Sequence, residues 1–310
     1  MTQSIACVSA FDLLLLVLLG AIWGASFLFI RVAAPVLGPI PLMDLRVIVA
    51  AAALLLYSAA RRRNPLLPHR WRDFVVLGTL NNAIPFVTIA TAELVLTASL
   101  GAILNATSPF FTVIVAAIWA RARPSAAQVA GTVIGFAGVA VLTGVGSLEL
   151  GPGVLGGIAL ALVGAFSYAV AAVYTGRTFL RLPPISLAVN QLIVSGTILL
   201  LPAIATRTAA PLDPAALASA VALALLGTSV GYLIYFRLIE RTGPTRAITV
   251  TLLIPIFGVL LGHLVLGDPV GPGLLAGLAL ILLGVSLVNG LLPAGRRVHV
   301  PTTGAGAASD

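Results

Sequence analysis

The chain carries very little charge, since only 8% of its 310 residues are Asp, Glu, Lys or Arg. Soluble globular proteins contain about 25% charged residues, which keep their surfaces hydrated. A soluble chain of this length cannot cover its surface with so few charges. The composition therefore excludes an ordinary soluble protein and predicts that lipid surrounds most of the chain.

Lysine is absent and cysteine nearly so: all 17 basic residues are Arg, the net charge is +8, and Cys7 is the one thiol. A single cysteine excludes an intramolecular disulfide and a cysteine-based metal site. The three His residues are dispersed, at positions 69, 263 and 299, and no phosphate-binding loop is present. We therefore expect no metal and no cofactor. We also expect no nucleic-acid partner, because loops between apolar segments account for the Arg residues.

Long apolar runs make up the rest of the chain, of which 60% is hydrophobic. A helix needs about 20 apolar residues to cross the hydrocarbon core of a bilayer. These runs are apolar on every face rather than alternating, which favours helices over a β-barrel. Apolar runs and turn residues predict ten transmembrane helices, at 11–31, 41–60, 73–94, 98–120, 126–145, 153–175, 185–205, 215–237, 244–266 and 271–292.

The Arg residues fall mostly in alternate loops, which predicts an orientation. Fourteen of the 17 lie on one side, at positions 61, 62, 63, 70, 72, 121, 123, 177, 181, 237, 241, 246, 296 and 297. Cytoplasmic loops are enriched in Arg. We therefore expect the inner membrane of a bacterium, with two cytoplasmic tails at 1–10 and 293–310. The first apolar run lacks a basic start and a cleavage site, which favours a retained helix over a signal peptide.

Short motifs recur along the chain at nearly constant separations. Gly20–Ala25 is similar to Gly164–Ala169 at a separation of 144 residues, and Pro109 corresponds to Pro255 at 146. Gly138 corresponds to Gly284 at that same separation. Each match alone is weak, but their order and spacing agree. The sequence therefore predicts an internal repeat.

The repeat covers five predicted helices, so two halves at 11–145 and 153–292 follow. Because five is an odd number, the second half must cross the membrane in the opposite sense to the first. Inverted repeats around a midplane site are a common architecture of secondary transporters. The sequence thus predicts an all-α integral membrane fold of ten helices in two inverted five-helix repeats.

Several motifs in this order also resemble a known family. They are residues 21–27 (Ala-Ile-Trp-Gly-Ala-Ser-Phe), Arg46, residues 108–110 (Ser-Pro-Phe), residues 254–257 (Ile-Pro-Ile-Phe) and the stretch from Gly131 to Gly138. Together with the ten predicted helices they resemble the EamA-type family of the drug/metabolite transporter superfamily. The resemblance covers about residues 11–292. It implies transport of amino acids, other metabolites or drugs, often outward.

The chain departs from the family pattern in one place. Members often have a Glu shortly after the fourth apolar run, where this chain has residues 119–123 (Trp-Ala-Arg-Ala-Arg). Asp268 lies in the corresponding place of the second half.

Polar residues inside the predicted helices mark a candidate substrate site. Arg46 lies in the helix 41–60, and an Arg at a helix centre costs at least about 2.5 kcal/mol, which makes it a functional candidate. The alternative is a structural Arg that reaches the interface or pairs with Asp44. Four amides are further candidates, either for binding a solute or for bonding helices together: Asn81, Asn82, Asn190 and Gln191.

Aromatic residues complete the candidate site. Trp23, Tyr168, Tyr232 and Tyr235 suit the wall of a cavity for an amphipathic solute, with packing or lipid contact as the alternative. Pro109 and Pro255 are predicted to kink their helices.

We therefore predict a transporter of small organic solutes that works by alternating access, and not an enzyme. Its partners are the solute and the bilayer, and a homodimer stays open. The alternatives are a lipid-modifying enzyme and a lipid scramblase, but no clustered catalytic residues are visible at membrane depth. The substrate, the direction of transport and the coupling ion are not determined by the sequence.

Overall fold

The computed structural model describes residues 9–144, 151–179, 182–207 and 213–291. Within these ranges every regular element is a helix, and no strand occurs. Most of both predicted tails, together with Cys7, Arg181 and Arg296, lies outside the described residues. The all-α prediction is confirmed for the part of the chain that the structure covers.

Five long helices are continuous, and three further spans are broken into shorter elements by a π-helical or irregular turn. The continuous helices are α1 (Ala10–Leu37), α2 (Pro39–Ala60), α7 (Ala126–Gly144), α8 (Pro152–Thr178) and α9 (Pro184–Ala205). The broken segments comprise η1 (Pro68–Arg70), α3 (Trp71–Gly78), η2 (Thr79–Ala83) and α4 (Ile84–Ala92); α5 (Ala98–Asn105) and α6 (Ser108–Trp119); α10 (Pro214–Ala224), η3 (Leu225–Val230) and α11 (Gly231–Thr242). The last elements are α12 (Pro244–Ala247), α13 (Val250–Leu266) and α14 (Pro272–Val288).

Length and composition identify the membrane-spanning segments. Eight helical segments are long and apolar enough to cross a bilayer, the broken ones counted as single segments. α13 and α14 have 17 residues each, the lower limit of spanning lengths. The structure supports a helical membrane protein, and the count of ten helices stays a prediction.

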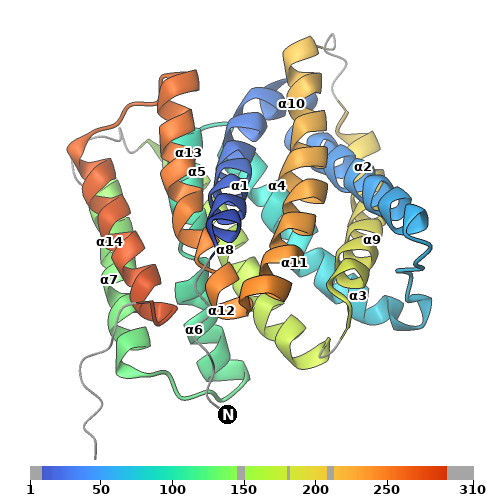
Figure 1. The fold of residues 1–310 in the computed structure, drawn as a ribbon. Coiled ribbons are helices and arrows are strands. Elements are labelled where there is room, and N and C mark those ends of the chain that lie inside the picture. Colours follow the sequence, from blue (N-terminus) through green and yellow to red (C-terminus); the bar gives the residue numbers. More distant parts are fainter. Residues whose placement is uncertain (1–8, 145–150, 180–181, 208–212, 292–310) are drawn as a thin grey trace, which may run out of the picture.

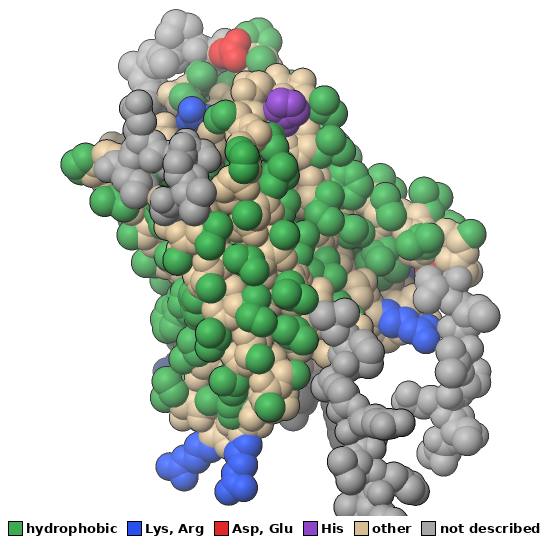
Figure 2. Space-filling view, turned by 90° about the vertical axis from the view of Figure 1, so that its left-hand side faces the viewer, with side chains coloured by type: hydrophobic (Ala, Val, Ile, Leu, Met, Phe, Trp, Pro, Cys, Tyr) green, Lys and Arg blue, Asp and Glu red, His purple; other side chains and the backbone are tan. Residues whose placement is uncertain are grey.

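The outer surface has the character expected of a lipid-facing surface. Figure 2 shows hydrophobic side chains across the face that α7 and α14 form, with charged side chains at its margins. Leu56, Ile118 and Leu201 are each more than 70% exposed. Such large exposed apolar areas are unfavourable in water and favourable in lipid.

Figure 1 shows the helices running between two ends of one bundle. One end carries the start of α1, the end of α2, the start of α3 and α12, and we call it the arginine-rich end. Two ion pairs lie there, Arg70–Asp73 at 2.7 Å and Arg241–Asp12 at 2.5 Å. The opposite end carries the starts of α2, α5 and α10.

Helices far apart in the sequence pack side by side in corresponding pairs. α7 packs on α14 and α2 on α9, while the pair α1 and α13 corresponds to the pair α8 and α6. The α7–α14 contact is reciprocal: a Cβ at Gly131 would lie 2.7 Å from the carbonyl oxygen of Gly284, and one at Gly138 would lie 2.9 Å from that of Gly277. The two helices therefore run antiparallel, at a distance that glycine alone allows.

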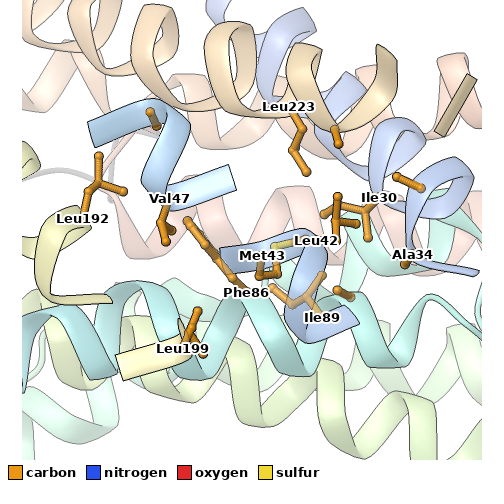
Figure 3. Packing of buried hydrophobic residues seen from close by; sticks show 14 of the residues in the cluster. Ile30, Ala34, Leu42, Met43, Val47, Phe86, Ile89, Leu192, Leu199 and Leu223 are labelled. Atoms are coloured by element: carbon orange, nitrogen blue, oxygen red, sulfur yellow. The ribbon is translucent and has the colours of Figure 1, made fainter. Parts of the chain in front are cut away.

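The largest buried core lies between α1, α2, α4, α9 and α10. Figure 3 shows Phe86 of α4 beside Met43 and Val47 of α2, with Leu192 and Leu199 of α9 nearby. This apolar packing fixes α2 against α4, and so positions Arg46 of α2 and the segment η2 that directly precedes α4.

Candidate functional site

Two π-helical segments occupy corresponding places in the two halves. η2 covers Thr79–Ala83 and η3 covers Leu225–Val230, and Leu225 follows Thr79 by 146 residues, the separation of the repeat. A π-helical turn shifts the hydrogen-bond register of a helix and occurs often at functional sites. Each segment carries the polar residues of one contact between the packed helices.

Arg46 makes the first contact, which we call the charged contact. Its side chain is 8% exposed, and its Nε donates a hydrogen bond of 2.9 Å to Oγ1 of Thr228 in η3. The guanidinium carbon lies 3.8 Å from the centre of the Phe86 ring, a cation–π arrangement. No carboxylate lies within 4.0 Å of Arg46 in the described chain, so it does not pair with Asp44. Within the part of the chain that the structure describes, Arg46 is thus buried without a carboxylate partner.

Tyr168 and Tyr232 lie within electrostatic range of the Arg46 guanidinium. Tyr168 of α8 meets the Phe86 ring edge-on at a centroid distance of 6.5 Å. Both tyrosines are half-buried, which leaves part of each ring accessible. One aromatic face, that of Phe86, therefore covers the buried cation, and two tyrosines lie in its neighbourhood.

An aromatic row leads from the charged contact along α11. Tyr232 stacks on Phe236 at 5.8 Å between ring centroids, Phe236 lies 6.4 Å from Tyr235, and Tyr235 lies 5.3 Å from Trp23. A Cβ at Gly231 would lie 2.5 Å from Nε1 of Trp23, so glycine there makes room for the indole. The structure thus brings Trp23, Tyr232 and Tyr235 into one row, and that this row forms the wall of a cavity stays a prediction.

The second contact, which we call the amide contact, joins η2 to α9. Asn81 Nδ2 donates to Gln191 Oε1 at 2.9 Å, and Asn82 Nδ2 donates to Ser195 Oγ at 3.1 Å. Gln191, Asn82 and Ser195 are buried, and Oδ1 of Asn82 has no partner among the described residues. This contact holds two helices together by neutral side chains.

Asn190 lies next to Gln191, but its side chain bonds to backbone groups instead of to η2. Its Oδ1 accepts a hydrogen bond of 3.1 Å from the Leu67 backbone N–H. Its Nδ2 donates to the carbonyl oxygens of Pro65 at 2.9 Å and Ser186 at 2.7 Å. All its polar atoms thus have backbone partners, which favours a role in fixing the loop before α3.

The two prolines have different surroundings. Pro109 is the second residue of α6 and directly follows the interruption between α5 and α6. Pro255 lies inside α13, several residues after the break that separates α13 from α12.

An apolar groove of about 310 Å³ lies between α2 and α9 and includes Ile48, Leu192 and Leu200 in its lining. None of the predicted site residues lines it. The groove is therefore distinct from both polar contacts.

The sequence interpretation missed Thr228, Ser195 and Phe86. Thr228 follows Asn82 by 146 residues, so the repeat already pointed to it as the counterpart of a residue that was singled out. Nothing in the local sequence marks Phe86 or Ser195, since a Phe or Ser in an apolar run is common.

Chemically, the charged contact suits an anionic group of a small molecule. It offers a buried guanidinium with free donor positions, a hydroxyl and aromatic faces, and it lacks a carboxylate that would compete for the cation in the described chain. Bidentate recognition of a carboxylate is a typical role of Arg.

Comparison with known proteins agrees with this architecture. A solved crystal structure aligns with a TM-score of 0.66, 20% identity, and coverage of 91% of this chain and 97% of that one, which shows a shared fold. An uncharacterized transporter of Archaeoglobus fulgidus is 28% identical over 274 residues, or 86% of this chain and 94% of the relative.

Two further relatives carry more specific names. The inner membrane transporter YedA of Escherichia coli is 27% identical, over 86% of this chain and 87% of the relative. A probable terminal-alkyne amino-acid exporter of Streptantibioticus cattleyicolor is 28% identical over 226 residues, which covers 70% of this chain and 72% of the relative. The model of the EamA-like transporter family matches twice, at residues 11–144 and 155–290. The chain therefore belongs to the EamA-like transporter family.

Proposed function

We propose that the chain exports small organic metabolites that carry a carboxylate, amino acids or related compounds, by alternating access. The observation that carries the proposal is Arg46, a buried cation whose hydrogen-bond partner is the neutral Thr228. A buried charge without a counter-ion is costly, and a solute carboxylate would offset that cost. Transport as such follows from the family, and the substrate class is the new element.

The aromatic row supports an amphipathic solute. Tyr232, Phe236, Tyr235 and Trp23 present ring faces that pack against an apolar side chain while Arg46 holds the carboxylate. This division of a site into an apolar wall and one orienting charge is typical of small-molecule sites. The amino-acid exporter among the relatives fits the same substrate class.

The helix pairs support alternating access. The reciprocal α7–α14 contact and the π-helical segments 146 residues apart are consistent with ten helices in two inverted repeats, split near residues 145–153. In such an arrangement each half supplies one gate. The charged contact and the amide contact occupy corresponding places, so we assign them to opposite sides of a midplane site.

The orientation rests on the Arg residues. With the arginine-rich end in the cytoplasm, both termini are cytoplasmic, and the charged contact lies toward the outer side. A bacterial inner membrane is the corresponding location, in agreement with one relative's name.

Reconstituted vesicles test the proposal. Purified protein is placed in liposomes loaded with radiolabelled amino acids, their decarboxylated amines, or unrelated drugs, and efflux of the label is measured. A fluorescent lipid in the same liposomes detects lipid scrambling. We expect efflux of at least one amino acid and much slower efflux of the matching amine. Equal rates for acid and amine would contradict the carboxylate assignment, and lipid scrambling without solute flux would favour the scramblase.

A further inference from the structure

Glu93 is a buried acid that the proposed transport site does not use. Its side chain is 0% exposed, and neither carboxyl oxygen has a hydrogen-bond partner among the described residues. Glu93 follows the last residue of α4, in the connection to α5, and so lies outside the membrane-spanning helices at the end opposite the arginine-rich end. A carboxyl group without donors in such a place requires an explanation.

The packing around Glu93 involves α1 and α5. A Cβ at Gly101 of α5 would lie 2.9 Å from Oε1 of Glu93 and 3.3 Å from Cδ1 of Phe27 in α1. Arg31 of α1 donates from Nη1 to the main-chain carbonyl oxygen of Glu93 rather than forming an ion pair with its carboxylate. The carboxyl group is therefore enclosed where three segments meet.

Asp268 provides an internal comparison at the same end. Its Oδ2 accepts hydrogen bonds from the backbone N–H of Ser99 at 2.9 Å and from the Ser99 hydroxyl at 2.7 Å. His263 Nδ1 lies 2.9 Å from the backbone carbonyl oxygen of Asp268. The Asp268 carboxylate thus accepts two hydrogen bonds, whereas the Glu93 carboxyl accepts none in the described structure.

The physical consequence concerns the proton of Glu93. Burial raises the pKa of the Glu93 carboxyl well above its ordinary value; Arg31 and Arg46 oppose this shift and Asp268 adds to it. A neutral carboxylic acid avoids most of the desolvation cost that a buried carboxylate pays. The closed packing of α1, α4 and α5 around this group therefore favours its protonated form.

We propose that Glu93 is a proton-binding site whose protonation closes the outer end of the substrate pathway. When α1 and α5 separate at that end, water reaches the carboxyl group, the proton leaves, and the charged form opposes closure. The inference rests on the proposed function, since it requires an outer end that opens.

The sign of the pH dependence follows from linkage. The closed state binds the proton more tightly than the open state, in which an exposed Glu has a pKa of about 4.3. Stabilisation of the closed state is complete below that value and is lost as the external pH rises through the raised pKa. At pH values between the pKa of Glu93 in the open state and its raised pKa in the closed state, one bound proton changes the ratio of closed to open states by at most about tenfold per pH unit.

A cysteine reporter at Ala98 tests this without any substrate. Ala98 begins α5 and is 0% exposed, so an Ala98→Cys thiol becomes reactive when the outer end opens. The experiment uses the full chain with Cys7→Ser, in right-side-out membrane vesicles, and a membrane-impermeant thiosulfonate reagent between pH 5 and 8. A Thr206→Cys chain, with an exposed thiol at the outer end of α9, corrects for the reagent's own pH dependence and checks the orientation.

We expect the corrected labelling rate to rise with pH, by up to tenfold per unit, and to become low and flat in Glu93→Gln, which mimics the neutral acid. His263→Gln is expected to keep the pH dependence. Together with Glu93→Gln it separates a contribution of Glu93 from one of Asp44, His263 or Asp268, other ionisable groups in this half. A flat rate with Glu93 present, or an unchanged dependence in Glu93→Gln, overturns the proposal. Absence of labelling at every pH, with Thr206→Cys labelled, instead contradicts opening and thus the proposed function. If Glu93→Gln does not reach the membrane, the pH dependence of the labelling rate in the chain that keeps Glu93, with and without His263→Gln, tests the proposal by itself.

Discussion

The charged contact and the amide contact occupy corresponding places in the two halves but have different chemistry. Arg46 meets Thr228 of η3 at 2.9 Å, and Gln191 meets Asn81 of η2 at 2.9 Å. The amide pair satisfies a neutral donor with a neutral acceptor. The guanidinium has several donors and one strong neutral acceptor at Thr228, with a weak contact of 3.9 Å to Met43 Sδ. The same architecture thus holds one closed pair and one cation that still has capacity to bind.

This difference shows that two helix contacts in corresponding places can have different roles, because one of them has a charged group that is able to bind an anion and the other does not. Both contacts connect a π-helical segment to a neighbouring helix, so in the proposed alternating-access cycle either one would separate when the halves move. In the proposed function only the contact with Arg46 would gain a new partner, the anionic group of the solute. We therefore expect substitutions at the charged contact to affect binding and those at the amide contact to affect stability and rate.

The largest effect is expected from Arg46→Gln, which makes the charged contact resemble the amide contact. Hydrogen bonds to charged groups contribute about 1.5–3 kcal/mol, so we expect a loss of about 10- to 150-fold in substrate affinity. Binding of amino acids to purified protein measures it. Arg123→Gln, at an exposed loop position, is the matched control. Unchanged affinity in Arg46→Gln would refute the assignment of the charged contact.

Trp23→Ala is expected to have the next largest effect, because it removes one end of the aromatic row. Aromatic contacts contribute about 0.5–1.5 kcal/mol beyond area burial, which corresponds to about tenfold weaker binding of substrates with apolar side chains. Competition binding with large and small amino acids measures the change. Trp71→Ala, at a 57% exposed tryptophan, is expected to bind normally. Equal losses for both variants would argue against a wall at Trp23.

Thr228→Val tests the hydroxyl that holds Arg46 in place. A hydrogen bond contributes about 1 kcal/mol net, so we expect about fivefold weaker binding with the guanidinium still present. The matched control is Thr197→Val, at an exposed position of α9. An effect as large as that of Arg46→Gln would mean that Thr228 itself contacts the substrate.

The smallest effect on binding is expected from Asn81→Ala in the amide contact. Loss of one neutral hydrogen bond costs about 1 kcal/mol, which corresponds to a melting temperature lower by about 2–4 °C, with substrate affinity within about twofold of the original. Thermal unfolding in detergent and binding are measured on the same sample, with Asn64→Ala at an exposed loop position as the control. A loss of affinity comparable to that of Thr228→Val would remove the distinction between the contacts.

Hydropathy predicted the helical membrane architecture well, because a segment such as α8 is long, apolar and uninterrupted. The broken segments were not predictable in the same way. The sequence of 73–94 predicts one helix, and one helical span, Pro68–Ala92, lies there, but the π-helical turn η2 between α3 and α4 was not predicted. A π-helical turn depends on hydrogen-bond register, which hydrophobic periodicity does not report.

The candidate site was predictable to the extent that rare residue types stand out in apolar helices. Arg46, Asn81 and Gln191 stood out because polar groups are costly in lipid. Their partners Thr228 and Ser195 did not, because hydroxyl residues are tolerated by bonding to the preceding turn of their own helix, as Ser195 does with the Gln191 carbonyl oxygen at 2.6 Å. Glu93 did not stand out in the sequence, because a single acidic residue next to a turn is common at a helix end, and only the three-dimensional packing shows that it is enclosed.

The central claim is that Arg46 binds the carboxylate of the transported solute, and one ratio tests it most directly. The affinity for an amino acid is divided by the affinity for its methyl ester, in wild-type protein and in Arg46→Lys and Arg46→Gln. We expect a large ratio in the wild type, an intermediate one with Lys, and a ratio near one with Gln, while the ester binds all three equally. A ratio that is the same in wild-type protein and in Arg46→Gln would contradict the claim.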